Sequence, residues 1–405
     1  MKQACSLGLI GLLATVSASA QSLYDVGSDA QDNTPLTWIL GVNAIYDDNV
    51  TPTGGGPEEE SFALNPYVGA SFVRTTPQTT VDLYARLGLI YYLDSPAGME
   101  DVNSQSRLGL NVTHSVSERL RFSSRNFISY ELEPDYSYGY ATSRATSEYL
   151  YYQTDNSVGY RWTERFGTYT GFRVGGLEYD DAHNDRTYFE PYNQFRYQLT
   201  PQTVLTAEYR YRWTEGSGLA SDTDDQYLLV GAEHRFNPNT IGVIRVGAQF
   251  HEVDLGDSST SPYLEASLRS QVNQQFSVQA FARYGIEGYD TVVLDNTGTL
   301  VEYDDRQTFR LGVSGDYSLS QRLSLFGGID YIPTSYEDGR IAGGFAGSPN
   351  SSFDESIFNA YVGFAVKFTD YLSGNVAYNF TDSSSDIDVR EYDRNRISVG
   401  LSAEF

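Results

Sequence analysis

The arginines are the residues whose type and spacing in this sequence could form a binding site. Most arginines lie in stretches where apolar and polar residues alternate, and they occupy the polar positions. A guanidinium group donates paired hydrogen bonds to a carboxylate or a phosphate. We therefore expect a surface that binds small anions. Strands with this alternation would place fifteen arginines on one face: Arg86, Arg107, Arg121, Arg125, Arg161, Arg173, Arg196, Arg210, Arg212, Arg235, Arg245, Arg269, Arg283, Arg310 and Arg396.

Carboxylates on the same face offer a second, purely structural use of these arginines. An arginine that pairs with an acidic residue on a neighbouring strand stiffens a sheet and binds no solute. Nine carboxylates can neutralise more than half of fifteen cations, so both interpretations stay open. The acidic residues in this register are Asp82, Asp155, Glu190, Glu208, Glu233, Glu265, Asp316, Asp330 and Glu404.

Other residue types indicate neither catalysis nor a metal site. The sequence has no Gly-x-Ser-x-Gly elbow, and of its four histidines only His183 and His251 lie near acidic residues on the expected loop side. Clustered carboxylates attract hard cations, but only 295–298 shares part of the pattern of a calcium loop. The one cysteine, Cys5, lies in a segment that we expect to be removed. We predict no enzyme activity, no cofactor and no metal.

Strands must position the arginines on one face. Segments of about ten to fifteen residues alternate, as where Val81, Leu83 and Leu87 contrast with Asp82 and Arg86. Short polar turns recur every 36 to 49 residues, and a longer loop rich in Asp, Gly and Ser lies midway between them. About 18 strands are predicted, with 16 as a lower count: 37–47, 61–74, 80–93, 103–115, 120–131, 148–162, 166–178, 187–199, 203–213, 226–236, 241–251, 261–270, 276–288, 307–319, 323–336, 354–368, 372–381 and 394–405.

An even number of two-faced strands, with tight turns at one end and long loops at the other, is typical of a barrel that spans a membrane. Strands in lipid must satisfy every backbone hydrogen bond, and only closure of the sheet does so. The predicted fold is all-β, a transmembrane antiparallel up-and-down β-barrel. Its inner face would be a pore lined by the fifteen arginines.

Composition and the first residues indicate an exported protein. The 405-residue chain carries a net charge of −26 at pH 7, which disfavours nucleic acid as a partner. Lys2, an apolar stretch over 4–16 and the small residues at 18–20 have the order of a cleavable signal peptide. We expect a signal peptide at 1–20, a short periplasmic segment at 21–36 and the barrel at 37–405.

The C-terminal strand resembles the assembly signal of Gram-negative outer-membrane proteins, where alternate apolar residues end in an aromatic one. Ile397, Val399, Leu401 and the terminal Phe405 form this pattern. The resemblance implies a multi-pass protein of the cell outer membrane, in contact with lipid and lipopolysaccharide. It also implies insertion by the barrel-assembly machinery through that strand, with both termini periplasmic and the long acidic loops extracellular.

The segment Tyr46-Asp47-Asp48-Asn49-Val50 resembles the start of β-barrel porins found in surface-polysaccharide gene neighbourhoods. Three functions are compatible with the pattern. The first is a porin-like channel for passive passage of small hydrophilic solutes, with anions among them. The second is an exporter of an anionic surface polysaccharide, and the third is a non-conducting structural or adhesive barrel with acidic surface loops. The sequence leaves the solute and the oligomeric state open.

Overall fold

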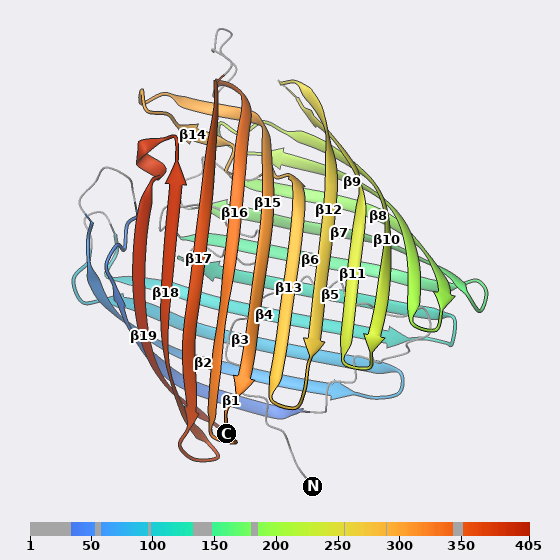
Figure 1. The fold of residues 1–405 in the computed structure, drawn as a ribbon, viewed down its shortest axis with the longest axis horizontal. Coiled ribbons are helices and arrows are strands. Elements are labelled where there is room, and N and C mark those ends of the chain that lie inside the picture. The colour runs from blue at the N-terminus through green and yellow to red at the C-terminus, as the bar shows by residue number, and fades with distance from the viewer. Residues whose placement is uncertain are drawn as a thin grey trace.

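The computed structural model describes residues 34–52, 58–95, 99–132, 148–179, 185–254, 256–288, 290–342 and 351–405. These residues form one antiparallel sheet of nineteen strands, one of them very short (Figure 1). The strands are β1 (Thr34–Asp47), β2 (Ser61–Thr75), β3 (Thr79–Tyr92), β4 (Val102–Ser115), β5 (Leu120–Glu131), β6 (Tyr149–Arg161), β7 (Phe166–Tyr179), β8 (Arg186–Thr200), β9 (Thr203–Gly216), β10 (Thr223–Asn237), β11 (Thr240–Val253), β12 (Ser258–Gln271), β13 (Phe276–Ile286), β14 (Val292–Leu294), β15 (Leu300–Ser318), β16 (Leu323–Ile341), β17 (Ser351–Lys367), β18 (Leu372–Ser385) and β19 (Tyr392–Glu404).

The sheet closes into a barrel because its first strand pairs with its last. β1 pairs with β2 along one edge and with β19 along the other, where Ile39 faces Glu404 and Asp47 faces Arg396. Every other wall strand pairs with its neighbours in the sequence, and β13 pairs directly with β15. β14 pairs only with the loop end of β15. The wall therefore has eighteen strands, and the predicted up-and-down barrel is confirmed.

The loop ends of β15 and β16 differ most from the predicted strands. β15 begins at Leu300 and β16 ends at Ile341, several residues beyond the predicted limits of 307 and 336. The acidic residues Asp304 and Asp305 indicated a solvated loop. In the structure Arg340 of β16 donates a hydrogen bond of 2.8 Å to Asp304, so the hairpin continues past the apolar part of the wall.

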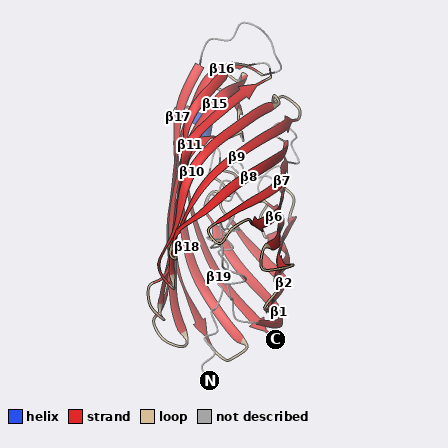
Figure 2. Cartoon of the chain, turned by 90° about the vertical axis from the view of Figure 1, so that its right-hand side faces the viewer, coloured by secondary structure: helices blue, strands red, loops and turns tan. Residues whose placement is uncertain are grey.

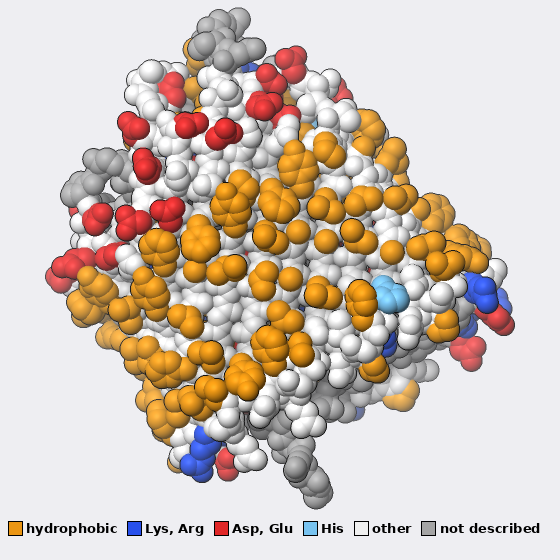
Figure 3. Space-filling view, viewed as in Figure 1, with side chains coloured by type: hydrophobic (Ala, Val, Ile, Leu, Met, Phe, Trp, Pro, Cys, Tyr) orange, Lys and Arg blue, Asp and Glu red, His pale blue; other side chains and the backbone are white. Residues whose placement is uncertain are grey.

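The outer face of the wall is apolar. Leu87 is 61% exposed and Val230 60% exposed, although both lie in the middle of strands. Figure 3 shows a broad belt of such side chains across the wall, below the acidic side chains of the loop end. Lipid is the environment in which this belt avoids the cost of exposing apolar surface to water. No helix in the described part of the chain is long and apolar enough to cross a membrane.

The barrel is flattened, and its two broad walls lie close together. Seen edge-on in Figure 2, it is much narrower than in the face-on view of Figure 1. The strands of the near wall, β11 to β19, cross those of the far wall in Figure 1. The C-terminus lies at the end of the barrel that carries the short turns, where Phe405 exchanges backbone hydrogen bonds with Trp38. Long polar side chains from several strands meet inside the barrel.

Candidate functional site

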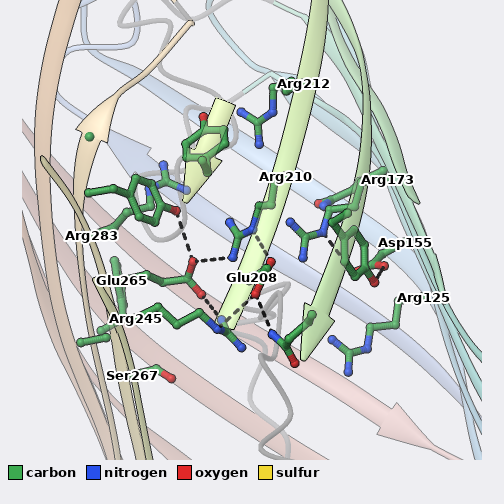
Figure 4. Close-up of a pocket in the computed structure, with 18 of the residues that line it drawn as sticks. Arg125, Asp155, Arg173, Glu208, Arg210, Arg212, Arg245, Glu265, Ser267 and Arg283 are labelled. Atoms are coloured by element: carbon green, nitrogen blue, oxygen red, sulfur yellow. Dashed lines mark hydrogen bonds and ion pairs between the residues drawn. The ribbon is translucent and has the colours of Figure 1, made fainter. Parts of the chain in front are cut away.

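A cavity of about 210 Å³ lies inside the barrel, on the side formed by β5 to β13 and β15. Its lining is dominated by arginine, acidic residues and tyrosine (Figure 4). All of the lining arginines belong to the fifteen that the alternation predicts on the inner face. They are Arg125, Arg173, Arg196, Arg210, Arg212, Arg245, Arg283 and Arg310.

The strand period of two places these groups inside. On β9, Glu208, Arg210 and Arg212 take alternate positions and point inward, whereas Tyr209 and Trp213 are exposed on the apolar outer face. The same alternation on the neighbouring strands brings further charged side chains to the same depth. The alternation within each strand therefore places charged side chains in the cavity. The pairing between strands determines which of these side chains form ion pairs.

One group of ion pairs joins β6 to β9. Arg173 of β7 donates hydrogen bonds to Asp155 (3.1 Å) and to Glu190 (2.5 Å). Arg212 contacts the second oxygen of Glu190 at 2.6 Å, and the Tyr192 hydroxyl donates to Asp155 at 2.7 Å. Glu190 is fully buried. Two guanidinium groups satisfy this carboxylate, which would otherwise be costly to bury.

A second group of ion pairs joins β9, β11 and β12 (Figure 4). Arg210 contacts Glu208 on its own strand and Glu265 at 3.5 Å. Arg245 contacts Glu265 at 2.6 Å and Glu208 at 3.7 Å. Gln194 donates a further hydrogen bond of 2.6 Å to Glu208. Each carboxylate has at least two cationic or polar partners, so the group forms a connected patch inside the wall.

Glu233 links this second group to β8. Arg196 holds it in a fork with hydrogen bonds of 2.5 and 2.7 Å, and Arg245 lies 3.8 Å away. Arg196 and Glu233 are 3% and 4% exposed. A buried, forked ion pair holds both side chains in one orientation.

Tyrosine rings support several of the guanidinium planes. Arg173 lies over Tyr192 with 4.7 Å to the ring centroid, and Arg212 lies over Tyr188 at 4.8 Å. Such cation–π contacts hold the guanidinium while leaving its edge able to donate hydrogen bonds. A guanidinium group held in this way can donate paired hydrogen bonds to a planar, oxygen-bearing anion.

The described part of the lining carries more arginines than carboxylates. Among the residues that the structure describes, eight arginines line the cavity together with five carboxylates, namely Asp155, Glu208, Glu233, Glu265 and Glu287. Glu190, which contacts two of the arginines, raises the number of carboxylates to six. Ion pairing therefore accounts for most of the described lining arginines, as the structural interpretation predicts, and more arginines than carboxylates line the described part of the cavity.

The other predicted arginines lie elsewhere on the inner side of the wall. Arg107 pairs with Glu131, and Arg86 donates to Asn65 at 2.9 Å while its guanidinium lies over the Tyr67 ring. The remaining ones do not line the cavity: Arg121, Arg161, Arg235, Arg269 and Arg396. Of all fifteen, ten lie within 4 Å of a carboxylate among the described residues, namely Arg107, Arg161, Arg173, Arg196, Arg210, Arg212, Arg245, Arg283, Arg310 and Arg396.

Glu287 is a cavity residue that the sequence pattern did not single out. It follows the last residue of β13 and accepts two hydrogen bonds of 2.7 Å from Arg310. Arg283 also contacts it, and Arg306 lies at 3.2 Å. Burial alone would raise the pKa of the Glu287 carboxyl, but Arg310 and Arg283 hold this pKa below its usual range. Arg306 lies in a segment that the sequence predicted to be a loop. Extending the alternation back from Arg310 through Thr308 would have placed the Arg306 side chain inward.

A strap, defined here as residues 290–299, covers the loop end of this half of the barrel. Thr291 accepts a hydrogen bond of 2.6 Å from Arg186 at the start of β8. Asp290 pairs with Arg390 of the short helix η1 (Asp388–Arg390) at 2.5 Å. Val293 packs in a buried cluster with side chains that include Tyr336. The strap thus connects β8 to the β18–β19 loop across the end of the barrel.

The architecture decides the class of this protein. A closed antiparallel barrel with an apolar outer belt is the fold of outer-membrane proteins. This chain is an outer-membrane β-barrel.

Comparisons with known proteins add little to that conclusion. No family model matches the chain, and no curated protein matches it. Among solved structures, it is similar to Pseudomonas aeruginosa OpdK with vanillate, at 12% identity and a TM-score of 0.48, over 91% of this chain and 99% of that one. Pseudomonas aeruginosa OccK2 (OpdF) in complex with glucuronate gives 10% identity and 0.47, over 92% and 98%. Acinetobacter baumannii OccAB4 gives 11% and 0.44, over 92% and 99%. Likenesses this weak carry no argument about the function of this barrel.

The Tyr46 to Val50 segment lies at the seam between the first and last strands. Arg394 of β19 holds Asp47 through both carboxylate oxygens, and both residues are buried. Asp48 accepts hydrogen bonds from the backbone and side chain of Asn395 at 2.6 and 2.7 Å. Asn49 donates to the backbone of β19 at 2.8 Å. In this barrel the segment clamps the seam at its loop end.

The remaining candidates have structural surroundings. His251 lies 2.8 Å from Asp225, and both are buried in the wall, whereas His183 lies outside the described residues. Asp295 accepts backbone hydrogen bonds from Thr297 and Thr299 at 2.9 and 2.8 Å, so its carboxylate closes a turn of the strap. No group of three His, Cys, Asp or Glu in the described ranges is arranged to hold a metal ion.

The residues of the C-terminal pattern lie on the outer face. Ile397, Val399 and Leu401 alternate with inward residues of β19, and each is 45 to 51% exposed. Phe405 is 65% exposed beside the short turns. The seam strand therefore presents its apolar side chains to the lipid.

Proposed function

We propose that this barrel is an outer-membrane channel for passive passage of small hydrophilic solutes, with a preference for anions. The observation that carries the proposal is the surplus of cations in the described lining of the cavity, where eight arginines face five carboxylates. Buried fixed charges, such as those of Arg196 and Glu233, act more strongly than charges at an exposed surface. Ion pairs and tyrosine rings hold these guanidinium groups in place, so a solute meets a preformed field.

Conductance across planar bilayers tests this proposal. Purified barrel in a tenfold KCl gradient should give open steps and a reversal potential whose sign reports chloride preference. A protein that inserts but never conducts would contradict the channel, and a cation-selective reversal potential would contradict the anion preference.

A non-conducting structural barrel is the second candidate. The observation that favours it is the depth of the ion pairs, since Glu190 is fully buried and Arg196 is 3% exposed. Such a network can close the lumen of a flattened barrel. Insertion without conductance would support this candidate.

Export of an anionic polysaccharide stays a prediction from the Tyr46 to Val50 segment. In the structure these residues hydrogen-bond to β19 at the seam, which is a structural role that does not involve a polymer. Deletion of the gene separates the two transport functions, because an exporter mutant should lose surface polysaccharide and a channel mutant should lose small-solute uptake.

We infer the location and the assembly of the protein from its N-terminal segment, its C-terminal strand and its acidic loops. Residues 1–20 would direct export, and the strand that ends at Phe405 would engage the barrel-assembly machinery. Both termini would be periplasmic, and the long acidic loops would face outward beside lipopolysaccharide.

A further inference from the structure

We infer that Glu287 is a built-in competitor of the solute: its carboxylate occupies guanidinium groups that an entering carboxylate would otherwise bind, and so it sets how tightly the channel holds anions. The inference rests on the proposed channel and adds to it a residue that determines affinity. It concerns small carboxylates, because Glu287 carries the same group as such a solute.

The geometry at Glu287 is that of a bound carboxylate. Arg310 donates to both of its oxygens at 2.7 Å, in the forked arrangement that guanidinium groups form with carboxylate ligands. Arg283 and Arg306 approach the same group from two further positions. Three cations therefore surround one anion. A second carboxylate could share this set of donors or replace Glu287 in it.

Arg310 retains a donor for such a ligand. The residue lines the cavity, is 1% exposed, and its Nη1 atom has no hydrogen-bond partner among the described residues. A buried donor without an acceptor is unfavourable. A carboxylate or a water molecule in the cavity would supply the acceptor, which marks this end of the cavity as a place where a solute gains a contact.

Glu287 differs from the other lining carboxylates in its place in the chain. Glu208, Glu233 and Glu265 lie within paired wall strands, and their positions are set by the backbone ladder of the sheet. Glu287 lies one residue beyond the end of β13, and its backbone N–H still donates to the Arg306 carbonyl of β15 at 3.0 Å. The backbone therefore stays paired when the Glu287 carboxylate rotates away from Arg310, so the side chain can yield to a solute.

The strap keeps its position without Glu287. Asp290 pairs with Arg390 at 2.5 Å, and Thr291 accepts from Arg186 at 2.6 Å. Arg306 also keeps its hydrogen bond of 3.0 Å to the Tyr336 hydroxyl. Substitution of Glu287 by glutamine, which has nearly the same shape, should therefore leave the barrel and the strap folded.

The test compares Glu287→Gln with wild type in planar bilayers, with benzoate as the probe and glucose as the uncharged control. The half-blocking concentration of benzoate should fall on the order of tenfold in Glu287→Gln, the usual worth of one charged hydrogen-bonded pair. Anion preference should rise, and glucose should have no effect on either protein. Glu58→Gln is the matched control, because it removes the same charge from an exposed loop. It should change the half-blocking concentration less than twofold.

The outcomes separate this inference from the proposed function. If wild type conducts and folded Glu287→Gln shows unchanged block, Glu287 is no competitor, while the channel stands. If neither protein conducts, the channel fails and the competitor fails with it. Should Glu287→Gln not assemble, Glu287→Asp replaces it, since the shorter side chain weakens the fork onto Arg310. Its block should tighten more than twofold, and unchanged block in the folded variant would overturn the inference.

Discussion

Ten of the fifteen interior arginines contact a carboxylate among the described residues, and the number of these contacts differs from one arginine to the next. Arg196 and Glu233 form a forked pair that is almost wholly buried, whereas Arg212 shares Glu190 with Arg173. Loss of a buried charge leaves its partner uncompensated, and the cost depends on whether another group remains. In the proposed channel, the same residue type would serve stability at one position and solute attraction at another.

Arg212→Gln should lower anion preference with little loss of stability. Glu190 keeps its contact of 2.5 Å with Arg173, while the cavity loses one positive charge. The reversal potential in a KCl gradient checks the selectivity, and the gel shift of the heat-treated barrel checks the fold. Arg196→Gln is the contrasting variant, since Glu233 would retain only Arg245 at 3.8 Å. It should destabilise the barrel by about 3 kcal/mol. Equal stability of the two variants would contradict the assignment of Arg196 to stability and of Arg212 to selectivity.

The pH dependence of the Glu287 contribution follows from its lowered pKa. A carboxyl whose folded pKa lies below its usual value of 4.5 stabilises the folded state fully above that value. The contribution is lost as the pH falls through the folded pKa. The difference in unfolding free energy between wild type and Glu287→Gln should thus be constant from pH 5 to pH 8 and shrink only below about pH 4. A difference that already changes near neutral pH would show that Glu287 titrates there.

Among the strands, the contact of β1 with β19 is the one that closes the sheet. Its loop end is held by Asp47, Asp48 and Asn49, all from the short motif that follows the first run of alternation. Closure removes the two free edges that an open sheet would leave in lipid. The motif therefore acts through the strand that it anchors.

Asp47→Ala should weaken the seam. Arg394 would be left buried without the carboxylate that it forks, and Arg396 would lose its contact of 3.2 Å. The expected loss is about 3 to 5 kcal/mol of unfolding free energy. Urea titration in detergent measures it. Asp393→Ala is the control on the same strand end, because only the backbone oxygen of Asp393 accepts the hydrogen bond from Asn49. A similar loss in both variants would mean that the pair is not what holds the seam.

For the whole molecule, two electrostatic fields oppose each other. The net charge of −26 comes largely from acidic loops, which surround the end of a barrel whose cavity is cationic. Salt screens exposed charges over about 10 Å at 0.1 M and buried ones much less. The loops should repel anions at low ionic strength and lose this influence first as salt is added.

Anion preference should therefore rise as KCl increases from about 0.03 to 0.3 M. Reversal potentials at a fixed gradient ratio measure the trend. Joint substitution of Glu58, Glu59 and Glu60 by glutamine should raise the preference at low salt and flatten the rise. A steady fall in preference with salt would show that the cavity alone sets selectivity.

The sequence by itself determined the wall of this barrel. Strand limits, the outward set such as Val399 and the inward set such as Arg210 follow from a period of two, which is a local property of extended chain. Turns and loops at regular spacing then fix an antiparallel order. The largest differences are β14 and the loop ends of β15 and β16, where acidic residues indicated solvated loops and an extended or hidden hairpin was only one of the alternatives.

The tertiary structure decided which charges meet. Asp47 and Arg394 are 347 residues apart, and Arg186 reaches Thr291 across 105 residues. Alternation places such groups on the inner face but says nothing of their height or their neighbours across a flattened lumen. Glu287 owes its place among three arginines to the pairing of β13 with β15 and to the path of the chain beyond β13. Pairing of this kind depends on closure of the whole sheet, which no local pattern contains.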